Sequence, residues 1–144
     1  MTTYYARSFK DLRVYHKARE VSRAVFRLSK TFPKEEMYSL TDQVRRAARS
    51  VGAQIAEAWG KRRYEKHFVS KLTDADAEQM EIQHWVGEAL DCEYISEAEA
   101  LRLNSGLAEI GRMLNSMMEK SDSFCGSPDG VLREDATEYF TAAD

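Results

Sequence analysis

A helical spacing of apolar residues, interrupted by only two prolines, constrains this chain of 144 residues more than any other feature. Apolar side chains recur every three or four residues, and no stretch alternates between polar and apolar residues as a half-buried strand does. Pro33 separates the first periodic segment from the second, and Pro128 lies beyond the last. The pattern predicts an all-α fold of four amphipathic helices.

Capping signals place two of the helix starts. The first helix should begin at Ser8, because Asp11 three residues later completes a capping box that satisfies the free amides of the first turn. It should end near Thr31, since Pro33 disfavours helix at the residue before it. A second capping box, Ser96-Glu97-Ala98-Glu99, marks the start of the fourth helix.

The second helix should follow a turn at residues 32–36 and run to about Arg63. We expect a break near Gly60, because glycine costs about 1 kcal/mol relative to alanine inside a helix. The third helix should carry the apolar residues from Phe68 to Leu90. Long amphipathic helices with short connections pack as antiparallel neighbours. We therefore predict one domain, an antiparallel up-down-up-down four-helix bundle over residues 8–121.

Residues 122–144 lose the helical period and are acidic, so we expect a flexible tail there. No apolar run approaches the roughly 20 residues that a membrane helix needs, and the first residues lack the apolar core of a signal peptide. Cys92 and Cys125 lack metal-ligand spacing. One disulfide and two free thiols both fit the sequence, and the free thiols of a reduced, cytoplasmic protein are the preferred interpretation.

Charge is distributed unevenly along the chain, although the net charge is only -3. Residues 43–63 hold six bases against the single acid Glu57, whereas residues 74–99 hold nine acids and no lysine or arginine. Such a polarised distribution is typical of a protein that binds a charged partner or another copy of itself.

The second and third helices each carry an unusual stripe outside their apolar one. On the second helix small residues recur every four positions beside arginines, and on the third an indole lies among carboxylates. Small residues allow another helix to approach closely, and an indole outside the core is typical of an interface. Either the basic helix of one subunit meets the acidic helix of a neighbour, which is a heterologous contact that closes as a ring, or the two faces meet within one subunit. The candidate interface residues are Arg45, Arg49, Gly52, Ala56, Gly60, Asp74, Glu78, Glu81, Trp85 and Glu88.

Lys61, Arg62 and Arg63, together with Arg46, are the candidates for contacts with nucleic-acid phosphates or with a protein partner. The lysine and the two arginines after Gly60 stand at a helix end, where a phosphate site and a solvated cluster fit equally well. Arg45 and Arg49, on the small-residue side of the second helix, are expected to pair with acids of the third helix, either in the same subunit or across an interface. A protein-binding adaptor that presents the rim of a ring is the alternative function.

Catalysis finds little support in the sequence. Glu81-Ile82-Gln83-His84 has the Glu-x-x-His spacing of a di-iron bundle, but only one copy of that motif is present and a complete ligand set needs two. Cys92 lies among acids that disfavour a thiolate. No glycine-rich phosphate loop occurs. We expect no enzyme activity, no metal and no cofactor.

The same segments resemble the bacterial four-helix bundle family known as 23S rRNA intervening-sequence proteins, which is related to the accessory protein of diversity-generating retroelements. Ile55-Ala56-Glu57-Ala58-Trp59-Gly60 is one of the matching motifs. The others lie at residues 8–15, 32–36, 38–51, 61–64, 67–75, 80–85 and 94–96. The resemblance implies a four-helix bundle that assembles as a homopentamer, and a partner that is RNA or an RNA-handling protein. The chain is net acidic, whereas the retroelement relatives are basic, which places it outside that subgroup.

Overall fold

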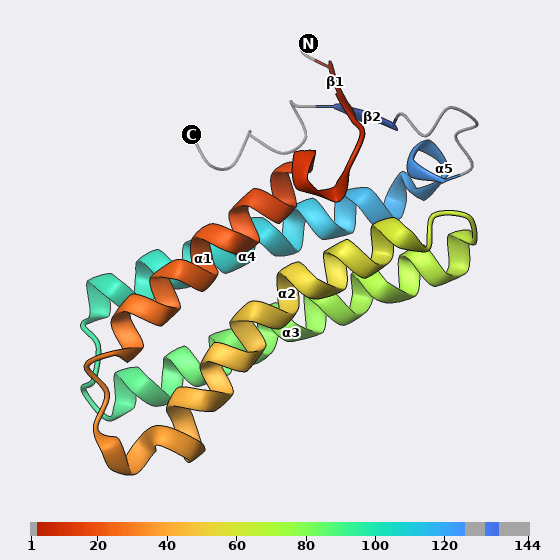
Figure 1. Ribbon diagram of the computed structural model, residues 1–144. Helices are drawn as coiled ribbons and strands as arrows, with labels where there is room; N and C mark the ends of the chain where they lie inside the picture. The colour runs from red at the N-terminus through yellow and green to blue at the C-terminus, as the bar shows by residue number, and fades with distance from the viewer. Residues whose placement is uncertain (1–2, 126–131, 136–144) are drawn as a thin grey trace.

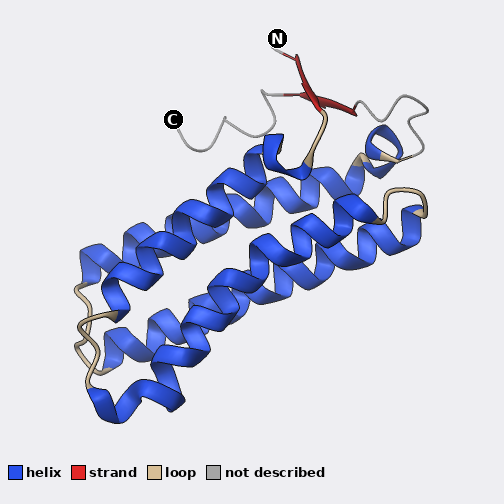
Figure 2. Ribbon diagram, viewed as in Figure 1, coloured by secondary structure: helices blue, strands red, loops and turns tan. Residues whose placement is uncertain are grey.

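Four long helices form the body of the protein. The computed structural model describes residues 3–125 and 132–135. The helices are α1 (Arg13–Ser29), α2 (Asp42–Gly60), α3 (Glu65–Asp91) and α4 (Glu97–Glu119), and Figure 2 shows how they dominate the chain. α1 and α3 each pack against both α2 and α4, and each helix runs back along the preceding one (Figure 1). The predicted four long helices are confirmed.

The core is built from one apolar stripe on each helix. The helical period predicts an apolar stripe on α4, and all of its residues are buried: Ala100, Leu103, Leu107, Ile110, Leu114 and Met117. Leu107, Ile110 and Leu114 have no exposed surface at all. Fully burying a side chain of this size stabilises the fold by about 1.5–3 kcal/mol. Leu72 and Ile82 of α3 are equally inaccessible. Helical periodicity in the sequence therefore identified the core correctly.

The start of the first helix is more complex than the sequence predicted. The Ser8 and Asp11 capping box is present, with the Lys10 amide donating to Ser8 Oγ at 3.2 Å and the Ser8 amide to Asp11 Oδ2 at 3.2 Å. It caps a short 3-10 helix, η1 (Phe9–Asp11), and extended backbone at Leu12 separates η1 from α1. The Leu12 side chain at this interruption is buried in the core, with 1% of its surface exposed.

The connections between the helices are short turns with defined hydrogen bonding. A 3-10 turn, η2 (Lys34–Glu36), and a π turn, η3 (Met37–Thr41), lead from the proline turn into α2. α2 ends at Gly60, where the break was predicted, and not at Arg63. After α3, Glu93 adopts a left-handed conformation with φ of 62°, and the amides of Glu93 and Tyr94 donate to the carbonyls of Leu90 and Ala89, both at 2.9 Å. These two bonds form a Schellman motif that ends α3.

The ends of the chain depart from the prediction. A short helix, α5 (Ser121–Phe124), follows α4, and its buried Phe124 stacks on Phe68 with ring centroids 5.9 Å apart. Strand β1 (Thr3–Ala6) pairs antiparallel with β2 (Leu132–Asp135). No strand was predicted. α5 begins at the last residue of the predicted bundle, and the rest of α5 and all of β2 fall within residues 122–144, for which a flexible tail was expected. Backbone pairing between distant segments leaves no periodic signal in either one. The rest of the predicted tail lies outside the described residues.

Candidate nucleic-acid interface

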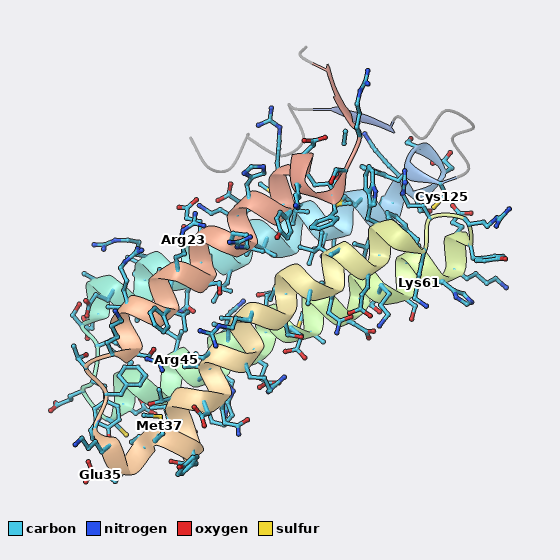
Figure 3. All side chains as sticks on the ribbon, in the orientation of Figure 1. Arg23, Glu35, Met37, Arg45, Lys61 and Cys125 are labelled. Atoms are coloured by element: carbon cyan, nitrogen blue, oxygen red, sulfur yellow. The ribbon has the colours of Figure 1, made fainter. Side chains whose placement is uncertain are left out.

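Six cationic side chains gather on the side of the bundle shared by α1 and α2. Arg19, Arg23 and Lys30 fall with Phe26 at the spacing i, i+4, i+7, i+11, which places all four on one side of α1. An open groove is lined by Arg19, Ser22, Arg23, Phe26, Arg27, Lys30 and Arg49. Figure 3 shows Arg23 on α1 and Arg45 on α2. We call this surface the α1–α2 basic face, and it comprises Arg19, Arg23, Arg27, Lys30, Arg45 and Arg49.

Phe26 lies at the centre of the α1–α2 basic face. Its side chain is 38% exposed. The Lys30 ammonium and the Arg45 guanidinium each lie 4.8 Å from the ring centroid, and the Arg49 guanidinium lies 5.7 Å from it. Cations over an aromatic face are attracted by its quadrupole. Arg45 Nε also donates to Ser29 Oγ at 2.7 Å, so the ring and the hydroxyl together position this arginine.

No carboxylate of the described residues neutralises this face. Within residues 3–125 and 132–135, none of its six cations forms a salt bridge with an acid. Within the subunit, Arg45 and Arg49 therefore do not pair with acids of α3, because both side chains turn toward Phe26 of α1. Their pairing with acids of a neighbouring subunit stays a prediction. The positive charge of the face remains available to an external anion.

Arg46, a predicted candidate for phosphate contact, lies on another side of α2 from Arg45 and Arg49. It points toward α3, where its guanidinium hydrogen-bonds Glu81 and lies 3.5 Å from Glu78. The bond to Glu81 raises the pKa of Arg46. The hydrogen bond from Trp85, followed in importance by the interaction with Arg46, lowers the pKa of Glu81. Arg46 is thus held by acids of its own subunit and is no longer a strong candidate for phosphate contact.

The acidic stripe of α3 divides into two groups. Glu78 and Glu81 bind Arg46, and Trp85 Nε1 donates to Glu81 at 2.9 Å while its ring packs on the core. For these residues the contact between the two faces occurs within one subunit. Asp74 and Glu88 remain exposed, with only Lys71 at 3.9 Å and His84 at 3.7 Å beside them. Only this second group is still suited to a contact between subunits.

The row of small residues on α2 also divides. Gly52 is buried, and a Cβ there would lie 3.5 Å from the Tyr15 ring of α1. This glycine therefore lies in the contact between α1 and α2 of the same subunit. Ala56 is half-buried and borders a second groove, which shares Arg19 and Arg49 with the α1–α2 basic face. Gly60 is exposed and has open space around it. The predicted interface row is therefore partly internal, and its accessible part continues the basic face.

The basic segment at the end of α2 has a mixed character. The Arg62 guanidinium lies 3.7 Å from the centroid of the Trp59 ring, and Arg62 Nε donates to the Trp59 carbonyl at 2.8 Å. Burial lowers the pKa of Arg62. Lys61 and Arg63 are exposed beside Tyr64, which is 60% exposed, and Figure 3 shows Lys61 at this end of the bundle. Two of the three predicted cations can meet a partner, while Arg62 covers the core tryptophan.

The residues considered for chemistry are engaged elsewhere or far apart. Glu81 accepts hydrogen bonds from Arg46 and Trp85, while His84 lies beside Glu88. The described residues contain no group of three metal-ligating side chains. Cys92 follows the last residue of α3, whereas Cys125 lies near Glu65 at its first, so about 40 Å of helix separates the two thiols. A disulfide between them within one chain is excluded.

No helix in the described part of the chain combines the length and apolar character that crossing a membrane requires.

Sequence reasoning missed the four cations that α1 and its C-terminal cap contribute to the α1–α2 basic face. Arg19, Arg23 and Arg27 recur every four residues, and Lys30 follows three residues later. That spacing was visible in the sequence, and Glu20 is the only acid of α1. The charge count that singled out residues 43–63 used one continuous segment, so it did not combine the arginines of α2 with those of a distant helix.

The helices and this surface define a small all-helical protein with a charged external face as its candidate site. The chain belongs to the 23S rRNA-intervening sequence protein family, whose match covers residues 10–116. It is also similar to a protein of unknown function from the S23 ribosomal protein family of Bacteroides thetaiotaomicron. The two are 26% identical with a TM-score of 0.67, and the match covers 74% of this chain and 98% of the other. No curated protein matches the chain. Neither match names the retroelement accessory protein, so that relation stays a prediction.

Proposed function

We propose that this protein is a non-enzymatic binding protein that assembles with copies of itself and binds RNA, or acts as an accessory protein to an RNA-handling partner. The α1–α2 basic face supports the proposal most directly, because six cations lie together there without a carboxylate partner among the described residues. Lys61 and Arg63 supply a second, smaller region of positive charge.

Affinity for RNA should depend steeply on salt. Each phosphate neutralised by a lysine or arginine releases condensed counterions, and for single strands the slope of log K against log salt is about -0.7 per contact. If all six cations of the face contact phosphates, the slope is about -4, and affinity falls roughly 300-fold between 50 and 200 mM salt. Filter binding at these two concentrations measures the change. Absence of binding at the lower concentration would remove the RNA hypothesis.

Self-association is supported by charge complementarity. Asp74 and Glu88 are exposed on α3, and Ala56 and Gly60 are accessible on α2 next to the exposed Lys61, outside the α1–α2 basic face. A contact between these unlike faces is heterologous, and its closure gives a ring such as the pentamer that the family resemblance implies. Light scattering coupled to size exclusion tests this assembly. A mass of 16.5 kDa at micromolar concentration corresponds to a monomer and would refute the proposal of self-association.

A protein-binding adaptor is the competing function. The exposed Tyr38 and Leu101, 82% and 72% accessible, are the kind of side chain that protein partners cover. Pull-downs with and without nuclease separate the two functions. Partners that are lost after nuclease treatment support RNA binding, and partners that persist support the adaptor.

A further inference from the structure

Phe26 presents an aromatic ring to solvent on an otherwise charged side of α1. The residues of α1 that face the core, among them Val25 and Ser29, are almost completely buried, whereas Phe26 stays 38% exposed. The neighbours that approach its ring are the cations Lys30, Arg45 and Arg49. The Phe26 ring is exposed outside the core and is surrounded by cations. It is therefore suited to contact a ligand that carries both aromatic groups and negative charge.

Nucleic acid is such a ligand. We infer that the α1–α2 basic face binds single-stranded nucleic acid, with phosphates on its arginines and one base stacked against Phe26. This inference rests on the proposed function and specifies the strand form that the face selects. Bases stack on exposed aromatic side chains irrespective of sequence, and arginine guanidinium planes around the ring add to the stacking surface.

The arrangement along α1 supports an extended strand. Arg19, Arg23 and Arg27 are each four residues apart, so their Cα atoms advance by about 6 Å per step along the helix axis. Phe26 lies beside the last two of these arginines and faces Arg45 and Arg49 of α2. A strand that follows the row of arginines therefore passes the ring, where an unpaired base can turn inward.

A duplex could use only part of this surface. Its bases are paired and stacked inside the helix, and the deep, narrow major groove of A-form RNA is inaccessible to side chains. Phe26 lies between two helices of the bundle and has no extended loop that would carry it into a groove. A duplex would therefore meet the cations but not the ring, and the face should bind single strands more tightly than duplexes of equal charge.

Fluorescence anisotropy on the full chain tests this preference with two labelled probes, a U-rich single strand and an RNA duplex with the same number of phosphates. Phe26→Leu keeps an apolar side chain but removes the aromatic face, and Phe26→Tyr restores that face. We expect Phe26→Leu to weaken single-strand binding by about 5- to 100-fold without changing the salt slope. Duplex binding should stay unchanged, and Phe26→Tyr should bind like the parent chain.

Two charge variants complete the test. Arg23→Ala should weaken both probes and make the salt slope shallower by about 0.7 for the single strand. Arg112→Ala, an exposed position on α4 away from the face, should leave both affinities unchanged.

Equal loss of duplex and single-strand binding in Phe26→Leu, or no loss in either, overturns the stacking inference while RNA binding by the face stands. Absence of binding to both probes by the parent chain overturns the proposed function itself. Circular dichroism melts verify that each variant is folded.

Discussion

Gly111 of α4 lies where α3 and α4 approach closely, and replacing it with alanine should destabilise the bundle. A Cβ at this position would lie 3.2 Å from Gln79 Nε2 and 3.4 Å from Asp76 Oδ1. Gln79 is 4% exposed, and its amide is fixed by hydrogen bonds to Asp76 at 2.9 Å and from Gln83 at 2.7 Å. The added methyl group therefore displaces a buried, hydrogen-bonded amide.

Two effects of opposite sign decide the outcome. Replacing glycine by alanine inside a helix stabilises it by about 1 kcal/mol. Leaving a buried polar group without its partner costs about 1–3 kcal/mol. Gly87 of α3 is a matched control, because a Cβ there meets nothing within 4 Å and only the first effect applies. Gly87→Ala should raise the free energy of unfolding, and Gly111→Ala should lie about 2 kcal/mol below it.

Urea denaturation followed by circular dichroism measures the free energy of unfolding of both variants. In thermal melts their melting temperatures should differ by roughly 6 °C. A Gln79→Ala background removes the amide that the new methyl group would displace. In that background Gly111→Ala should stabilise the protein as Gly87→Ala does, which a double-mutant cycle reveals as coupling. Equal stabilisation by the two alanine variants in the parent chain would refute the close approach of α3 and α4 at Gly111.

Three further predictions concern other parts of the bundle. Glu93→Gly should raise the free energy of unfolding by about 0.5–1 kcal/mol in urea titration, because glycine adopts the left-handed conformation of the α3 terminus without strain; Glu93→Ala should give no such gain. The folded-state pKa of Glu81 is lowered by Trp85 and Arg46, so its contribution is present above its unfolded pKa and is lost as pH falls through the lowered value. Melting temperatures below about pH 4.5 should therefore fall less steeply in Glu81→Gln than in the parent chain. Leu114→Ala removes a side chain with no exposed surface and should cost about 2–5 kcal/mol, and a loss below 1 kcal/mol in urea denaturation would contradict its place in the core.

Local signals explain what the sequence predicted well. The capping boxes at Ser8 and Ser96 both form, because each depends on residues three positions apart. The helix break at Gly60 and the buried stripe of α4 follow from equally local patterns. Features that depend on residues distant in the sequence were missed or misassigned, since a helical wheel does not show which neighbouring helix each side meets.

Trp85 and Arg45 illustrate that limit. On the wheel Trp85 lies away from the apolar stripe of its helix, yet its ring packs on the core and its indole donates to Glu81. Arg45 and Arg46 are adjacent in the sequence, but one turns to Phe26 of α1 and the other to Glu81 of α3. The α1–α2 basic face exists only because two helices bring their cations together. A charge count along the chain found the half on α2 and missed the half on α1.

The pairing of β1 with β2 has a consequence for how the protein folds. These strands lie at opposite ends of the described chain, and all four long helices are enclosed in the loop that their contact closes. If the strands paired first, closing this long loop would cost chain entropy before the helices had formed any stabilising contacts. The cost is much smaller once the intervening chain is compact. The two strands should therefore join after the helices have packed. Amide hydrogen exchange should then find β1 opening while α3 and α4 remain protected.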